Sequence, residues 1–361
     1  MIRIRHISVI FAILLFLFSC SENTTPPDNK KNNLSDCPPR YSDGDGYRYP
    51  KIKYYDQRVS YDLTKLITYV GSKGICLIDL NTLELKILNN IIKNAILEYE
   101  DTVKYQIEFG PLNPVWCPYS NDKIMVLCQT MIDTIGDCKK YVGGTNFYIV
   151  SLDGKECKKV TPVQFGKAGA RIGIMTPQWL FGSGFSLDSL YFYILGTYII
   201  QQKVLVSNNK FMVRQSLSGK HWFGYDSESS VTAHKVIDGR IFYFPEEYLL
   251  LENTSISPDE KYIAFSVKLS DNKIPDSLRR YEEIWIIDLE KYLREKPDTV
   301  QIMNIINLRR EFCMYNSTGL EAEFITNHTL AVGMHKDEPG AVQNLWEISI
   351  DGKIIRQLTK D

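Results

Sequence analysis

Apolar and polar residues alternate along much of the chain in short runs that end at turn-forming residues. One such run follows Ser257-Pro258-Asp259, and its residues 262–267 alternate between two faces. The proline predicts a tight turn. The alternation of side chains with a period of two residues predicts that a β-strand follows this turn. Residues 284–287 are continuously apolar and lead to Asp288-Leu289-Glu290, which predicts a second strand, buried on both faces, and then a polar turn.

Imperfect copies of this unit recur along the chain. The turn and first strand return at 114–126, and a strand with an Asp-Gly turn returns at 146–155 and at 344–353. Weaker copies lie at 60–80 and 177–220. Repetition of strand, turn and strand predicts an all-β chain, built as a β-propeller of four-stranded antiparallel blades.

The copies resemble the WD-related repeats of the TolB-like β-propellers, whose blades read roughly Trp-Ser-Pro-Asp-Gly, two strands, Asp-Gly and a last strand ending in Leu-Thr. The resemblance covers about residues 55 to 361, although Cys117-Pro118-Tyr119 replaces the usual Ser-Pro-Asp in one copy. Such blades occur in periplasmic scaffold proteins, in regulatory domains of prolyl peptidases and in sugar-processing enzymes. The resemblance therefore implies a fold and no single activity.

The spacing of the copies bears on the number of blades. The copies lie farther apart than the roughly 40 to 45 residues of a plain four-stranded blade. The widest interval, from Trp179 to Ile256, contains a further predicted hairpin at 235–244. Six blades are favoured, and five or seven stay open.

The first residues form a basic and then apolar segment. Arg3 and Arg5 precede the apolar residues 7–18, which end at Ser19-Cys20. This segment is short for a membrane span and resembles a bacterial lipoprotein signal, which implies cleavage before Cys20 and acylation of that residue. An ordinary signal peptide or a short anchor is the alternative.

These features divide the chain into three parts. Residues 1–19 are the predicted signal peptide, 20–54 the acylated cysteine with a polar, flexible tether, and 55–361 the propeller. The resemblance implies a protein of the bacterial cell envelope, held by lipidated Cys20 on the periplasmic or surface face of a membrane, such as the outer membrane.

Seven further cysteines follow Cys20. An exported protein can pair some of them, and Cys128 and Cys138, which flank a predicted loop, are the first candidate pair. Burial as small apolar side chains is the alternative. The odd number leaves at least one thiol unpaired in a monomer.

Neither charge nor motifs point to catalysis or to nucleic acid. The net charge is −1 and there is no basic stripe, so we expect no nucleic-acid partner. The segment 182–186 does not match the Gly-x-Ser-x-Gly elbow of hydrolases. The four histidines after the leader match no common zinc spacing; they are His221, His234, His328 and His335. We predict no catalytic residue, no metal site and no cofactor.

One segment is a candidate binding patch. His221, Trp222, Phe223 and Tyr225 follow a predicted turn at 218–220. In an exposed loop, these side chains would form an apolar patch on the edge of the propeller. Packing between blades is the alternative use of such aromatic residues.

The sequence as a whole favours a lipid-anchored module that binds a protein, peptide or glycan without catalysis. The alternative is an enzyme that acts on an envelope glycan or peptide. Its catalytic residues would be dispersed over several blades around a central pocket and would leave no linear motif.

Overall fold

The computed structural model describes a large part of the chain after residue 51, in several ranges. They are 52–100, 105–109, 112–117, 120–128, 130–135, 138–141, 146–159, 183–185, 190–192, 210–218, 220–226, 234–244, 249–269, 281–314, 322–336 and 341–360. Antiparallel sheet dominates these ranges, which confirms the predicted all-β class.

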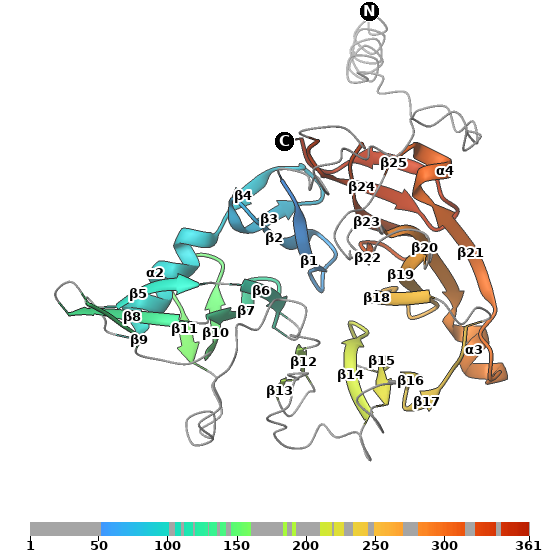
Figure 1. The fold of residues 1–361 in the computed structure, drawn as a ribbon, viewed down its shortest axis with the longest axis horizontal. Coiled ribbons are helices and arrows are strands. Elements are labelled where there is room, and N and C mark those ends of the chain that lie inside the picture. The colour runs from blue at the N-terminus through green and yellow to red at the C-terminus, as the bar shows by residue number, and fades with distance from the viewer. Residues whose placement is uncertain are drawn as a thin grey trace, which may run out of the picture. The chain divides into compact units, whose positions relative to one another are not determined.

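Five four-stranded antiparallel sheets form the blades of a β-propeller (Figure 1). The first consists of β1 (Tyr54–Val59), β2 (Lys65–Val70), β3 (Gly74–Asp79) and β4 (Leu85–Ile87). The second consists of β6 (Leu112–Trp116), β7 (Lys123–Cys128), β10 (Asn146–Ser151) and β11 (Cys157–Lys159). The third consists of β14 (Lys210–Gln215), β15 (Trp222–Asp226), β16 (His234–Ile237) and β17 (Arg240–Ile241).

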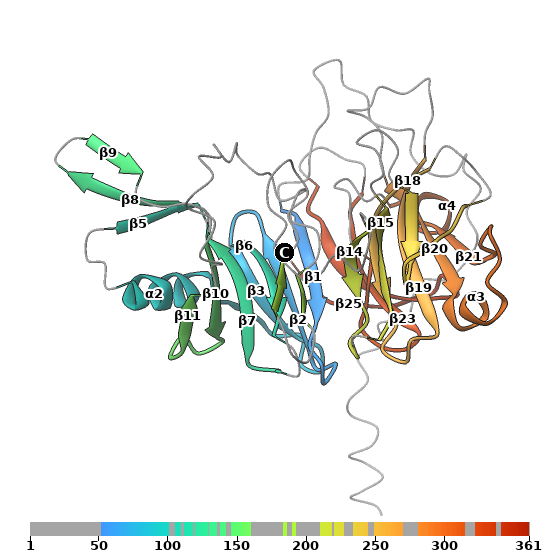
Figure 2. The ribbon, with the colours of Figure 1, turned by 90° about the horizontal axis from the view of Figure 1, so that it is seen from below.

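The last two blades are formed in the same way. One consists of β18 (Leu249–Ile256), β19 (Tyr262–Leu269), β20 (Tyr281–Asp288) and β21 (Ile302–Asn307). The other consists of β22 (Ala322–Phe324), β23 (Thr329–Met334), β24 (Asn344–Ser349) and β25 (Ile354–Gln357). In each blade the strands pair with their neighbours in chain order, as in Figure 2 for β18 to β21.

Within the described ranges, the remaining elements are two small sheets and three helices. The sheets are β5 (Tyr105–Phe109) with β8 (Thr130–Ile135) and β9 (Cys138–Tyr141), and β12 (Ser183–Phe185) with β13 (Leu190–Phe192). The helices are α2 (Asn89–Tyr99), α3 (Leu289–Glu295) and α4 (Leu308–Phe312).

The five complete blades fall within the predicted range of five to seven. The hairpin predicted at 235–244 is formed by β16 and β17, and it completes the blade β14–β17. The pair β12–β13 lies in the chain between the blades β6–β11 and β14–β17. Much of that interval, including 160–182 and 193–209, is outside the described residues.

The alternation that predicted the strands also sets which blade each side chain contacts. On β19, Ile263 and Phe265 pack into a cluster with Phe223 of the preceding blade. Ala264, between them, belongs to a cluster with Phe324 of the following blade. The middle strands are therefore buried on both faces, as the continuous apolar run at 284–287 predicts.

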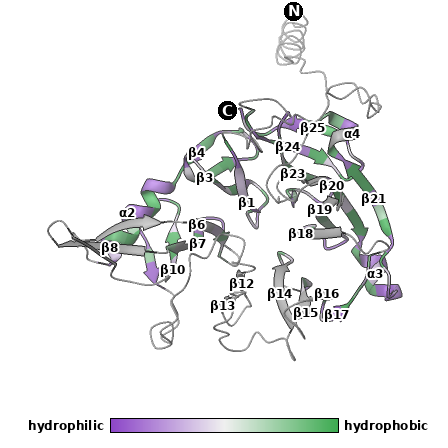
Figure 3. Ribbon diagram, viewed as in Figure 1, coloured by the Kyte–Doolittle hydropathy of each residue, from purple (hydrophilic) through white to green (hydrophobic). Residues whose placement is uncertain are grey.

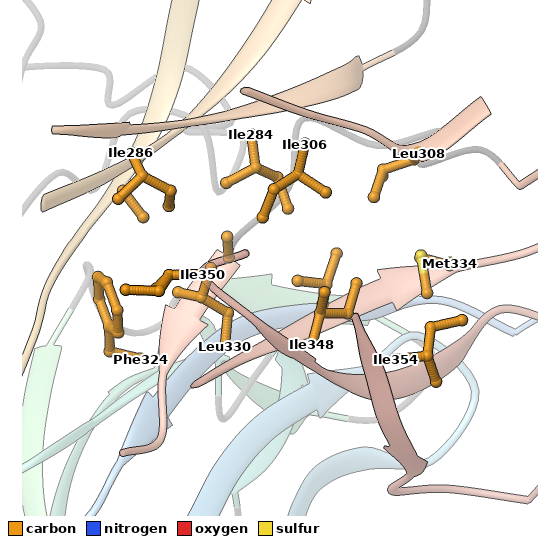
Figure 4. Packing of buried hydrophobic residues seen from close by; sticks show 13 residues of the cluster. Ile284, Ile286, Ile306, Leu308, Phe324, Leu330, Met334, Ile348, Ile350 and Ile354 are labelled. Carbon is orange, nitrogen blue, oxygen red and sulfur yellow. The ribbon is translucent and has the colours of Figure 1, made fainter. Parts of the chain in front are cut away.

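Hydrophobic side chains fill the interface between the last two blades. Ile284 and Ile286 of β20 lie across from Phe324 and Ile348 of the next blade (Figure 4). All four are at most 2% exposed. Full burial of such side chains contributes roughly 1.5–3 kcal/mol each, so contacts between neighbouring blades supply much of the stability.

The cysteines lead to one correction. Of the two alternatives, the candidate Cys128–Cys138 disulfide is not formed and burial holds for Cys128, because Cys128 is a thiol, 2% exposed, inside an apolar cluster. Cys128 ends β7 and Cys138 begins β9, and these strands belong to different sheets. Burial raises the pKa of the Cys117 and Cys157 thiols to about 12 and about 11. Cys313, in contrast, is disulfide-bonded.

Candidate functional site

The turn between the first and second strands of a blade carries the repeated motif. We call these turns, at 60–64, 120–122, 216–221 and 257–261, the rim turns. The hydroxyl of Ser60 donates to Asp62 at 2.6 Å, and that of Ser257 donates to Asp259 at 2.8 Å. The amide of Tyr262, where the second strand begins, donates to the Ser257 oxygen at 2.9 Å. The serine and aspartate of the repeat thus fix the conformation of the turn.

The residue after the aspartate adopts the left-handed conformation. The φ angle is 60° at Leu63 and 61° at Glu260. TolB-like repeats place glycine here, and a residue with a Cβ costs about 1–2 kcal/mol. Strained backbone of this kind is often found where a side chain has a specific use. The contacts of Glu260 show such a use.

The carboxylate of Glu260 joins its blade to the preceding blade, β14–β17. It accepts hydrogen bonds from the hydroxyls of Ser216, at 2.7 Å, and Ser218. Its other oxygen lies 3.8 Å from Nε2 of His221, and Nδ1 of His221 lies 2.7 Å from Asp238. We call Ser216, Ser218, His221, Asp238 and Glu260 the His221 cluster.

Asp238 fixes the orientation of the imidazole. It is the first residue of the Asp238-Gly239 turn between β16 and β17, and both residues have positive φ angles, 48° and 79°. One carboxylate oxygen accepts from the Trp222 amide at 2.8 Å while the other contacts Nδ1 of His221. The imidazole is thereby held with Nε2 towards Glu260.

The His221 cluster is partly shielded from solvent. The side chains of His221, Asp238 and Glu260 are 12%, 28% and 16% exposed, so the cluster is shielded without being closed to solvent. Both serine hydroxyls donate to Glu260, so their single protons are engaged within the cluster. The cluster offers a polar group of fixed geometry at the junction of two blades.

The structure separates His221 from the rest of the predicted patch. Residues 222–226 form the second strand of a blade, β15, and not an exposed loop. Trp222 is 9% exposed and Phe223 is fully buried, with its ring centroid 5.3 Å from that of Phe265. Exposure of these two residues was therefore wrongly predicted, because strands β14 and β16 flank them and the next blade covers Phe223. The side chain of Tyr225 lies outside the described residues.

A second polar centre joins the first strands of three blades. Glu323 of β22 is 2% exposed and accepts hydrogen bonds from the Val59 amide of β1 at 3.1 Å and the Ser255 hydroxyl of β18 at 2.9 Å. The Ser255 oxygen in turn accepts from the Phe324 amide at 2.9 Å. Glu323 was not predicted from the sequence, where the only signal for it is a single acidic residue in a short apolar strand.

The part of the chain that the structure describes contains neither a group of side chains suited to a metal ion nor a helix suited to crossing a membrane. No group of three or more histidine, cysteine, aspartate or glutamate side chains there could hold a metal ion. Among the same residues, none of the helices combines the length and the apolar character that a bilayer crossing requires. Cys20, the predicted lipidation site, lies outside the described residues.

Known proteins resemble this chain in structure but not detectably in sequence. No family model matches, and no curated protein matches. Similar solved structures include TolB from Acinetobacter baumannii, with 12% identity and a TM-score of 0.34 over 84% of this chain. This chain covers 53% of that TolB chain, about half its length.

Two other similar structures match over nearly their whole length. Kluyveromyces lactis Hsv2 has 11% identity to this chain and a TM-score of 0.35. The match covers 84% of this chain and 96% of the Hsv2 chain. The Cps50 (Swd1) β-propeller domain of Myceliophteria thermophila has 9% identity and a TM-score of 0.36. That match covers 84% of this chain and 99% of the Cps50 domain. TolB and a β-propeller domain are thus among the similar structures, and the sheet topology of this chain is that of a propeller.

Proposed function

We propose that this chain is a lipid-anchored β-propeller of the bacterial cell envelope that binds a protein, peptide or glycan at its rim turns. The observation that carries the proposal is the His221 cluster, in which partly exposed polar groups of two blades converge in a fixed arrangement. His221 is the member of the predicted patch that lies at this position.

The rim turns favour binding because they are ordered before a ligand arrives. Serine–aspartate hydrogen bonds hold three of the four turns, and in the turn at 216–221 the His221 amide donates to the Ser216 oxygen at 3.1 Å. The Asp62 amide also donates at 3.0 Å to Asn121 of the neighbouring blade. A surface that is already ordered loses little conformational entropy on binding. Exposed Lys220 lies beside the His221 cluster, and its ammonium group can donate to the carbonyl or hydroxyl oxygens of a peptide or glycan.

The sequence supports the membrane anchor and the compartment. Residues 7–18 followed by Ser19-Cys20 have the order of a lipoprotein signal. The disulfide at Cys313 fits an oxidising compartment outside the cytosol. Both features favour an envelope location.

Affinity capture tests the binding role. The full-length lipoprotein would be isolated from its own envelope and its partners identified by mass spectrometry, beside a Lys220→Glu variant and a Glu98→Lys control on α2. We expect a reproducible partner that Lys220→Glu loses and Glu98→Lys retains. Recovery of no partner, together with turnover of an envelope glycan, would contradict the proposal and favour the enzyme alternative.

Metabolic labelling tests the anchor separately. Labelled palmitate should enter the wild-type chain and fail to enter a Cys20→Ala variant. Because several acyl chains hold a protein firmly to a bilayer, the variant should also appear in the soluble fraction. Undiminished labelling of Cys20→Ala would show that Cys20 is not the lipidation site.

A further inference from the structure

Cys313 differs from the other cysteines whose side chains the structure describes. It is disulfide-bonded. The others are free thiols; they are Cys76, Cys117, Cys128 and Cys157. Because the structure consists of one chain, the partner of Cys313 belongs to the same chain. Three cysteines of the sequence remain as candidates, and these are Cys20, Cys37 and Cys138.

Cys313 lies where helix α4 meets the last blade. Its neighbours Phe312 and Met314 pack against the apolar cluster between the last two blades. A Cβ on Gly352, in the last hairpin, would lie 2.5 Å from a carboxylate oxygen of Glu311. Helix α4 adjoins β24 and β25 of that blade in Figure 3. Cys313 itself is partly exposed, so a segment from outside the blades can reach its sulfur.

The backbone at Cys313 indicates that the side chain has a specific use. Its φ angle is 52°, and the amide of Met314 donates to the Leu308 carbonyl at 3.3 Å, which ends helix α4. Glycine is the usual residue at this position of a helix end, since it adopts the left-handed conformation without a steric penalty. A cysteine in this conformation therefore points to a role for its sulfur.

Cys138 does not fit as the partner. It begins β9, which pairs with β8 and through it with β5. Strand β5 contacts α2, and α2 packs on β10 and β11 of the second blade. The first blade contacts both the second blade and the last blade and so lies between them. A disulfide requires Cα atoms within about 7 Å of each other, and Cys313 lies at the last blade.

We propose that Cys37 of the predicted tether, which lies outside the described residues, forms the disulfide with Cys313. The exclusion of Cys20 rests on the proposed function, in which its sulfur carries a lipid and has no thiol left to oxidise. On formation of the bond, two S–H groups lose two protons and two electrons. A disulfide of an envelope thiol oxidase accepts them and becomes a dithiol.

The bond ties the two ends of the propeller together. The first and last blades each consist of four strands that are consecutive in the chain, so neither contributes a strand to the other. Their described contacts are non-covalent, such as the Tyr54 amide donating to Gln343 at 2.8 Å. Cys37 precedes the first blade and Cys313 precedes the last, so the bond joins these blades covalently. It also holds the propeller within about 60 Å of an anchor at Cys20, instead of about 120 Å for an extended tether.

Peptide mapping under non-reducing conditions tests the pairing in the full-length protein from its own envelope, with free thiols blocked by N-ethylmaleimide before digestion. Trypsin places Cys37 in peptide 32–40, Cys313 in 311–336 and Cys138 in 124–139. We expect peptides 32–40 and 311–336 to be joined and to separate on reduction. Cys37→Ser should leave Cys313 free to react with the reagent, whereas the matched control Cys138→Ser should keep the joined pair.

The outcomes separate this pairing from the proposed anchor. A joined pair in Cys20→Ala would show that the disulfide forms whether or not the chain is lipidated. Peptide 311–336 joined to 124–139 would overturn the pairing alone, and a bond to Cys20 would overturn both the pairing and the anchor. Cys37→Ser should also unfold at a temperature several degrees below the wild type, because the bond restricts the unfolded chain. Equal unfolding temperatures would overturn the inference that the bond fastens the blades.

Reduction provides the control for the thermal measurement. A reductant should lower the unfolding temperature of the wild type to that of Cys37→Ser and leave the variant unchanged. An equal effect of the reductant on both proteins would assign the loss to another bond and contradict the pairing.

Discussion

Single side chains hold each rim turn, and Asp62 shows how. Its carboxylate accepts from the Ser60 hydroxyl at 2.6 Å, the Thr64 amide at 3.0 Å and the Thr64 hydroxyl at 2.7 Å. Burial alone would raise the pKa of Asp62. The hydrogen bonds and the charge of Lys65 outweigh burial and hold the pKa below its usual 3.8. The ionised carboxylate therefore stabilises the folded state.

Removal of Asp62 should destabilise the protein in a way that depends on pH. We expect Asp62→Ala to lower the free energy of unfolding by about 1 kcal/mol at neutral pH, because three donors lose their acceptor at an exposed turn. A depressed folded-state pKa means that this contribution is present above pH 3.8 and disappears as the pH falls through the lower folded value. Urea unfolding of the full-length protein in detergent, from neutral to acidic pH, measures the difference.

The control for this prediction is another carboxylate. Glu98 is exposed on α2, and Glu98→Ala should change the free energy of unfolding by less than about 0.5 kcal/mol. A deficit in Asp62→Ala that persists undiminished in strong acid would show that its ionised carboxylate is not the stabilising group.

At the scale of the element, the sequence predicted strands better than it predicted what lies between them. The alternation at 262–267 identified β19 because each of its faces packs on a different blade. Residues 288–290, predicted as a polar turn, begin helix α3, where the Asp288 carboxylate accepts from the Lys291 amide at 2.7 Å. Aspartate is favoured both in turns and at the start of helices, so its presence alone does not distinguish them.

The candidate site was predictable in part, for a similar reason. A turn before His221 was readable from Ser218-Gly219-Lys220, and His221 does lie in a rim turn. The aromatic residues after His221 are as typical of an exposed patch as of a buried strand. Phe223 lies in the core because the next blade packs on it, and the local sequence does not show that packing. The contact with Glu260 joins residues from separate blades, which local patterns do not show.

A glycine allows the tight turn before the last strand of a blade, and Gly154 is an example. Gly154, in the Asp-Gly turn before β11, has a φ of 76°, and a Cβ there would lie 2.7 Å from the Ile91 side chain. We expect Gly154→Ala to lower the free energy of unfolding by about 1–3 kcal/mol, because strain and a steric clash add. Chemical unfolding of the full-length protein measures this.

A second glycine provides the control for this prediction. A Cβ at Gly71 would lie 4.0 Å from the Tyr55 ring, which is an ordinary contact, and Gly71 does not have a left-handed φ. Gly71→Ala should therefore be close to neutral. A loss as large in Gly71→Ala would indicate a general cost of changing turn glycines and no specific clash at Gly154.

At the scale of the whole molecule, neighbouring blades are joined by apolar clusters and by a few specific polar contacts. The first and last blades share a cluster that includes Tyr54 and Leu345. The indole of Trp116 donates to the Arg58 carbonyl at 2.9 Å, which links the first two blades. Because apolar contacts are not directional, we infer that these polar contacts fix the register of one blade on the next.

Glu260 allows this inference to be tested at one junction. Ser216 is 5% exposed and donates to Glu260, so Glu260→Ala leaves a buried hydroxyl without its acceptor and should cost about 1–3 kcal/mol. Glu260→Gly loses the same contacts but relieves the left-handed strain at φ 61°, so it should be less damaging by about 1 kcal/mol.

A double-mutant cycle between Glu260→Ala and Ser216→Ala then measures the contact between the two blades. Residues in direct contact are expected to show a coupling energy of about 0.5–3 kcal/mol. Such coupling, in the free energy of unfolding of the full-length protein, would show that the hydrogen bond stabilises the junction. Strictly additive losses would mean that apolar packing alone holds these blades together, and the strained Glu260 would then be retained for the exposed side of the His221 cluster, where we expect a ligand to bind.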